Sequence, residues 1–184
     1  MKVLVAGMGN DLCRDDGFGI ETVRRLATVP LPEGVRVIES GIGGIALVQE
    51  LMDGYDRLVI VDAADRGGSP GTVYVLQMDV PYVDDLSAAA RAEFTADMHY
   101  TVPSKALLLA RALGVLPPLV YLLGCQPAEQ GLGIGLSGQV EKGVTKAVEE
   151  LGRLFTHKSL IPSCHDPQPY CDERPLTDPA SLDF

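Results

Sequence analysis

One short, uninterrupted apolar run, Leu58–Val61, is followed at once by an acidic residue, Asp62. An apolar run without polar alternation is typical of a strand buried on both faces, as in a parallel sheet covered by helices. Val3–Ala6 and Leu119–Leu123 have the same character. Because parallel strands need long crossover connections, helices should separate these runs. This pattern restricts the chain to a small set of α/β architectures.

The segments between the apolar runs have helical spacing of their apolar residues. We predict helices at residues 15–27, 45–52, 84–96, 103–113 and 136–155, and further strands at 35–38 and 72–76. The strand at 72–76 follows its predecessor too closely for a helical crossover, which predicts that it is antiparallel. We therefore predict an α/β three-layer sandwich, with a twisted, mainly parallel five-stranded sheet and helices on both faces.

The length of 184 residues suits one domain, which we place at residues 1–155. Residues 156–184 hold five of the thirteen prolines and have no periodic apolar pattern, so we predict a flexible Pro-rich tail. The tail carries Cys164, His165 and Cys171, whose spacing matches no common zinc motif.

The chain is acidic, with 15 Lys and Arg against 25 Asp and Glu and a net charge of −10. This charge argues against nucleic acid and against an anionic membrane surface as partners. We find no targeting signal, and no apolar run reaches the ~18 residues of a membrane helix. The isolated cysteines Cys13 and Cys125 fit a reducing cytoplasm. We expect a cytoplasmic monomer.

The candidate chemistry lies in loops that follow the predicted strands. In open α/β sheets, ligands bind beyond the carboxyl ends of the strands, so Gly7–Asn10, Glu39–Gly44 and Asp62 should meet in one cleft. Asp16, Asp62 and His99 would provide two oxygen ligands and one nitrogen ligand, a set that suits zinc, nickel or a similar divalent ion.

Other interpretations of the same residues stay open. Asp15 and Asp16 could cap a helix, Asp62 could accept hydrogen bonds from the next turn, and His99 could lie on the surface. The Gly7-x-Gly9 pair with Glu39 weakly resembles a dinucleotide site.

Two other kinds of site, a dinucleotide site and a serine or cysteine nucleophile, fit the sequence poorly. A dinucleotide site lacks its third glycine here, and the acidic pair at residues 15 and 16 would repel a pyrophosphate. A nucleophilic serine motif fails because Gln139 replaces the final glycine, and Cys13 has no basic neighbour except Arg14.

Several short elements occur in a characteristic order between residues 2 and 155. They are Gly7–Gly19 with its acidic pair, Val59–Ala64, Pro70–Thr72, His99 ahead of a Leu/Ala-rich helix, Gly124–Pro127, and Gly135–Ser137 with Val140. Together they resemble the hydrogenase maturation proteases, the endopeptidases that process the large subunit of nickel–iron hydrogenases.

The resemblance implies that Asp16, Asp62 and His99 converge on a metal ion, the nickel already inserted in the large-subunit precursor, and that the enzyme then removes a C-terminal extension. Other divalent metals could occupy the site in vitro. The family often has Glu where this chain has Asp16. Many members also have Asp-Gly-Gly-Thr where this chain has Glu39–Gly44, so we assign Glu39, Gly41 and Gly43 to substrate recognition.

Two hypotheses describe the role of the carboxylates. In the first, the metal polarises the scissile carbonyl or a water while Asp16 or Asp62 acts as base. In the second, metal contact serves recognition only. Two alternatives from other classes are a non-cleaving, nickel-sensing chaperone or binding module for the large subunit, and a dinucleotide-dependent oxidoreductase.

Overall fold

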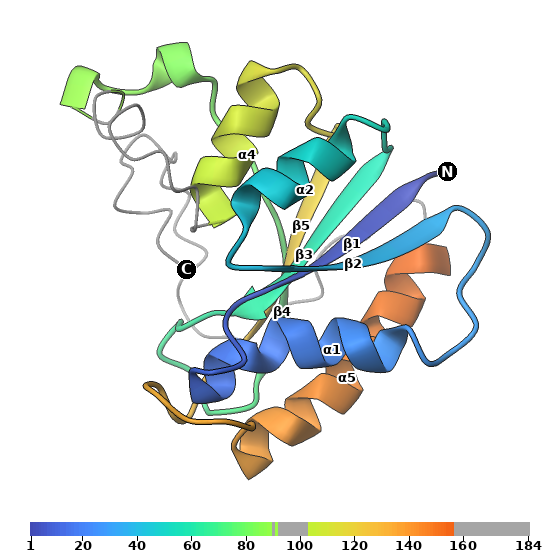
Figure 1. The fold of residues 1–184 in the computed structure, drawn as a ribbon, viewed down its shortest axis with the longest axis vertical. Helices are drawn as coiled ribbons and strands as arrows, with labels where there is room; N and C mark the ends of the chain where they lie inside the picture. The colour runs from blue at the N-terminus through green and yellow to red at the C-terminus, as the bar shows by residue number, and fades with distance from the viewer. Residues whose placement is uncertain (90, 92–102, 157–184) are drawn as a thin grey trace.

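The computed structural model describes residues 1–89, 91 and 103–156. Its centre is one sheet with the strand order β2-β1-β3-β5-β4 (Figure 1). The strands are β1 Val3–Met8, β2 Val35–Gly41, β3 Arg57–Ala63, β4 Val73–Gln77 and β5 Leu119–Cys125. Neighbouring strands are parallel except for β4, which pairs antiparallel with β5. The predicted five-stranded, mainly parallel sheet and its one antiparallel strand are confirmed.

Helices cover both faces of this sheet. They are α1 Phe18–Leu26, α2 Gly44–Leu51, α4 Pro103–Ala112 and α5 Gly138–Thr156, with short 3-10 helices η1 Arg14–Gly17 and η2 Val83–Asp85. Figure 1 shows α2 and α4 on one face and α1 and α5 on the other, which confirms the predicted layers. In the described part of the chain, no helix combines the length and apolar character needed to cross a bilayer.

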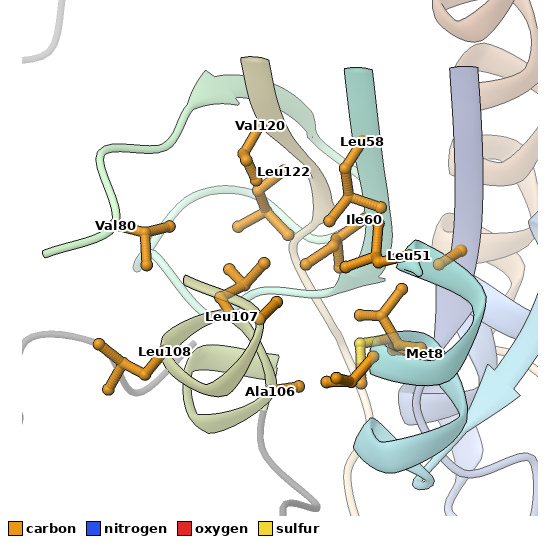
Figure 2. Close-up of a cluster of buried hydrophobic side chains, with 14 of the residues drawn as sticks. Met8, Leu51, Leu58, Ile60, Val80, Ala106, Leu107, Leu108, Val120 and Leu122 are labelled. Atoms are coloured by element: carbon orange, nitrogen blue, oxygen red, sulfur yellow. The ribbon is translucent and has the colours of Figure 1, made fainter. Parts of the chain in front are cut away.

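The central strands contribute to two separate cores. Leu58 and Ile60 of β3 pack toward α2 and α4, as Figure 2 shows. Val59 and Val61 pack on the other face with α1 and α5. Successive side chains of a strand point to opposite faces of the sheet. When helices cover both faces, the side chains in the middle of the strand are all buried and are therefore apolar. This double burial explains why the run at residues 58–61 is uninterrupted.

Several boundaries differ from the sequence prediction. The strand predicted at 35–38 continues as β2 through Glu39 to Gly41, residues that the prediction placed in a loop. Asp62 lies inside β3, opposite Gly124 of β5, rather than in the loop after the strand. The prediction of a helix at 84–96 is wrong at its start. The 3-10 helix η2 occupies residues 83–85, and the helical hydrogen bonding begins only after it, with a bond from the Arg91 amide to the Ser87 carbonyl. The rest of that segment, His99 and the predicted flexible tail lie outside the described residues.

Gly19 lets α1 lie directly on the backbone of the sheet. A Cβ atom there would stand 2.1 Å from the carbonyl oxygen of Val61 and 2.3 Å from that of Met8. We expect Gly19→Ala to lower the free energy of unfolding by about 2–3 kcal/mol, because the whole helix must move away from two strands. Urea denaturation measures this change.

Gly152 of α5 offers a matched control, since a Cβ atom there would meet nothing within 4 Å. Gly152→Ala should stabilise the protein by roughly 0.5–1 kcal/mol through helix propensity. Equal effects of the two substitutions would contradict the close approach of α1 to the sheet.

Candidate active site

Asp16 and Asp62 come together at the carboxyl edge of β1 and β3, with Gly9 between them. Gly9 has φ +108°, and a Cβ atom there would lie 1.9 Å from the main-chain oxygen of Asp16 and 3.3 Å from Oδ1 of Asp62. Only glycine adopts this conformation without strain while leaving that space free. The glycine-rich turn therefore brings an acid from η1 next to an acid from β3.

Asp62 is buried, with 7% of its surface exposed. Its Oδ1 accepts a hydrogen bond from the Ala63 amide at 2.8 Å. Burial, followed by the nearby charge of Asp16, raises the pKa of Asp62 to about 7, although the Ala63 amide acts in the opposite direction. A buried acid beside a second acid, at the end of a central strand, is a typical sign of a functional site. A cation between the two carboxylates would favour their charged forms.

Asp16 is held by the loop that precedes it. Its Oδ2 accepts a hydrogen bond from the Asn10 amide at 2.8 Å, and Asn10 Oδ1 in turn accepts from the Leu12 amide at 3.0 Å. Neither η1 nor α1 has a side-chain cap, so Asp16 does not serve as a helix cap. The Asn10 amide is thereby occupied by a carboxylate, which argues further against a phosphate in this turn.

Asp15 has a structural function that the sequence analysis missed. It is fully buried and accepts hydrogen bonds from the amides of Ala128, Glu129 and Ser137 at 2.8, 2.7 and 2.6 Å, and from the Ser137 hydroxyl at 2.9 Å. Burial alone would raise the pKa of Asp15, but these hydrogen bonds outweigh it and hold the pKa below the usual range. Asp15 thus fixes the loop between β5 and α5 beside η1.

Ser137 was recognisable in the sequence as a helix-start residue, since it immediately precedes α5. Its hydroxyl also accepts a hydrogen bond from the Val140 amide at 3.4 Å, the pattern of an N-cap. The sequence contained no sign that the same hydroxyl donates to Asp15, because 122 residues separate the two.

Glu39 and Gly41 line a cleft of about 300 Å³ on the β2 side of Gly9. Glu39 Oε2 accepts hydrogen bonds from Arg24 Nε at 3.1 Å and Nη2 at 2.9 Å, and Arg24 Nη1 reaches Asp11 at 3.2 Å. The Gly41 carbonyl accepts from the Gly9 amide at 3.3 Å. Gly43 does not line this cleft. It lies in the turn after β2, where its amide donates a hydrogen bond to the Ser40 carbonyl at 2.9 Å.

Gln126, in the Gly124–Pro127 element, shapes the loop that follows Asp62. Its Oε1 accepts from the amides of Arg66 and Gly68 at 2.8 and 3.1 Å, and its Nε2 donates to Asp65 at 2.8 Å. The sequence contains no sign of these contacts, because 58 to 61 residues separate Gln126 from its partners.

Among the described residues, no three His, Cys, Asp or Glu side chains cluster closely enough to hold a metal ion. Asp16 and Asp62 supply two candidate ligands, and the third, His99, lies outside the described residues. The thiols of Cys13 and Cys125 are free. Burial raises the pKa of Cys125 to about 12, so this thiol stays protonated and unreactive.

Comparison with known sequences shows the family to which this chain is related. The family model described as hydrogenase maturation protease matches residues 20–153. The hydrogenase expression/formation protein HupD of Rhodobacter capsulatus is 34% identical over 156 residues, which are 82% of this chain and 71% of the relative. A putative hydrogenase maturation protease of Methanocaldococcus jannaschii is 33% identical over 156 residues, 80% of this chain and 92% of its own length.

Solved structures show the same fold. The hydrogenase maturating endopeptidase HybD from E. coli superimposes with a TM-score of 0.67 at 28% identity, covering 85% of this chain and 93% of that one. HybD from Thermococcus kodakarensis, a [NiFe] hydrogenase maturation protease, gives 0.63 at 29% identity, covering 84% and 99%. The chain therefore belongs to the hydrogenase maturation protease family, and it is a peptidase with a role in hydrogenase maturation.

Proposed function

We propose that this protein is the endopeptidase that removes the C-terminal extension of a nickel-loaded nickel–iron hydrogenase large-subunit precursor. The observation that carries the proposal is Asp62, a buried carboxylate placed against Asp16. No Lys or Arg among the described residues forms an ion pair with either acid. Two acids held together, with no described Lys or Arg paired to either, suit a site that receives its positive charge from the substrate.

In this proposal Asp16, Asp62 and His99 bind the nickel ion that the substrate carries. Nickel accepts carboxylate and imidazole ligands as well as softer sulfur donors, so one ion can be shared between the protease and substrate thiolates. Zinc and other divalent ions fit the same donors. Asp16 is one methylene shorter than Glu, and the Asn10 amide sets its direction. Asp16 or Asp62 then acts as base toward the attacking water.

The cleft beside Gly9 supports a recognition role for Glu39 and Gly41, and we extend the proposal to Gly43 in the adjoining turn. Glu39 forms one wall through its ion pair with Arg24. Gly41 holds the Gly9 turn in place through its carbonyl. Gly9 and Asn10 line this cleft, and the Asn10 amide donates to Asp16, so a substrate segment in the cleft would lie against the turn that holds Asp16. We propose that the enzyme acts as a monomer on a transiently bound protein.

Mass spectrometry of a large-subunit precursor, incubated with this protein in nickel-loaded and nickel-free form, tests the proposal. We expect a C-terminal peptide to be released from the loaded precursor only, because the carboxylate pair needs the metal for productive binding. A zinc-loaded precursor controls for charge alone. Equal cleavage of the nickel-free form would contradict nickel recognition. A stable complex with no released peptide would favour the alternative, a nickel-sensing chaperone.

A further inference from the structure

The loop between β5 and α5 exposes two aliphatic side chains almost completely. Leu132 is 90% exposed and Ile134 is 83% exposed, more than any other large hydrophobic side chain in the described residues. Leu12, on the loop before η1, is 58% exposed. Single exposed apolar residues are ordinary, but grouped ones mark interaction sites on soluble proteins. We call these three residues the apolar ridge.

The ridge stands on backbone that is firmly held. Leu12 and Gly133 are tied by a hydrogen bond from the Gly133 amide to the Leu12 carbonyl at 2.9 Å, and the Arg14 amide donates to the Gly133 carbonyl at 2.8 Å. Arg14 also lies against Gly133, where a Cβ atom would stand 2.3 Å from its Nε. Asp15 secures both ends of the same loop. The exposure of the ridge is therefore part of the fold and not a consequence of loose chain.

The ridge lies beside the carboxylate pair. Figure 1 shows the loop between β5 and α5 next to η1, and the bridge between Cys13 and Gly133 joins them. Leu12 precedes Asp16 by four residues on the same short segment. The ridge is thus joined through the backbone to the segment that carries Asp16, one of the two carboxylates.

We propose that the apolar ridge docks the folded protein substrate, through an apolar patch next to the metal that the substrate presents. This inference rests on the proposed function. A preformed, rigid apolar surface loses little conformational entropy on binding, which makes it suited to anchoring a partner. The rim of the ridge includes two ion pairs, Arg14 with Glu129 and Arg24 with Asp11, so the complementary patch should be apolar at its centre with charged groups of both signs at its border.

Two other occupants fit the observations less well. A second copy of this chain would bring together two molecules that each have a net charge of −10. The C-terminal tail follows α5, whose Leu154 carbonyl is bound by Arg57 at the first residue of β3. The tail therefore begins near the end of the sheet where the parallel strands start, whereas the ridge follows the end of β5.

The test compares two double variants of the full-length protein. Leu132→Ser with Ile134→Ser removes the ridge. Met52→Ser with Leu113→Ser removes exposed apolar side chains before β3 and β5, at the opposite edge, and serves as the control. Binding of the nickel-loaded precursor is measured by biolayer interferometry, and cleavage by steady-state kinetics.

We expect the ridge variant to raise Kd and KM at least about tenfold with kcat within about twofold of wild type, because its substitutions spare both carboxylates. The control variant should match wild type. Unchanged Kd and KM in the ridge variant, with wild-type cleavage intact, would overturn the docking role alone. Failure of the wild-type protein to bind or cleave the precursor would overturn the proposed function, and the docking role with it.

Sedimentation velocity and limited proteolysis of the ridge variant decide between the occupants. We expect the same sedimentation coefficient as wild type at all concentrations, and the same rate of cleavage within residues 157–184. A wild-type dimer that the variant loses would assign the ridge to a second copy. Faster proteolysis of the tail in the variant would assign the ridge to the tail. Either result overturns docking of the substrate.

Discussion

Asp62→Asn should lower kcat/KM for peptide release by at least about a hundredfold, and at the same time make the free protein more stable above pH 7. The loss of activity follows because an amide neither acts as a base nor neutralises a divalent ion. The gain in stability follows because Asp62 is buried beside Asp16, and the pKa of Asp62 is raised to about 7. Peptide release and urea denaturation of the same samples measure both effects.

The pH dependence of the stability gain has a defined sign. Between the unfolded pKa of 3.8 and the folded pKa of about 7, the folded protein holds a proton on Asp62 that the unfolded chain has released. The wild-type protein therefore loses stability as pH rises through this window, and the loss is complete above it. The difference between Asp62→Asn and wild type should grow to roughly 2–4 kcal/mol at pH 8 and be small at pH 4.

A second carboxylate variant separates catalysis from recognition. If the acids only recognise the metal, Asp16→Asn and Asp62→Asn should weaken binding of the loaded precursor in proportion to cleavage. If one acid is the base, its variant should retain binding with a much lower kcat. Asp84→Asn, at a side chain 97% exposed, removes the same charge as a control. Near wild-type cleavage by both active-site variants would exclude the carboxylates from the reaction.

The elements that sequence could predict are those whose physical cause is local. The run at Leu58–Val61 lacks polar positions because both faces of β3 are covered, and that pattern is visible in four residues. The short link before Thr72 excluded a crossover helix, so β4 had to be antiparallel. The prediction that Gly7–Asn10 and Asp62 converge followed from the geometry of parallel sheets alone.

The sequence alone could not distinguish the roles of Asp15 and Asp16. Asp15 and Asp16 are chemically identical neighbours, yet Asp15 is fully buried and Asp16 lies at the candidate site. The partners of Asp15 are 113 to 122 residues away, and no local pattern encodes such contacts. The ion pair between Glu39 and Arg24 could not be predicted for a different reason. Both residues belong to amphipathic or edge segments, where charged side chains are expected without any specific partner.

Asp15→Ala should destabilise the protein by about 3–5 kcal/mol, because three amides and the Ser137 hydroxyl lose a fully buried acceptor together. Ser137→Ala removes only one of these bonds, together with the N-cap contact to the Val140 amide, so we expect about 1–2 kcal/mol. Urea denaturation measures both changes. Amide hydrogen exchange at Ala128, Glu129 and Ser137 should become faster in Asp15→Ala and stay slow at β3, since the loop opens before the sheet does.

The pH profile of this variant should be the reverse of that of Asp62→Asn. The pKa of Asp15 is lowered, so the stability it provides is fully present above the unfolded pKa of 3.8 and is lost as pH falls through the lower folded pKa. The difference between wild type and Asp15→Ala should thus stay constant from pH 5 to 8 and shrink in more acidic solution. A difference that grew toward acid would contradict the assignment of Asp15 as the ionised anchor of the loop. Opposite dependences of stability on pH would show that Asp15 and Asp62 have different roles. Ionised Asp15 stabilises the fold, whereas ionised Asp62 destabilises it, which is expected of a residue that serves the function of the site.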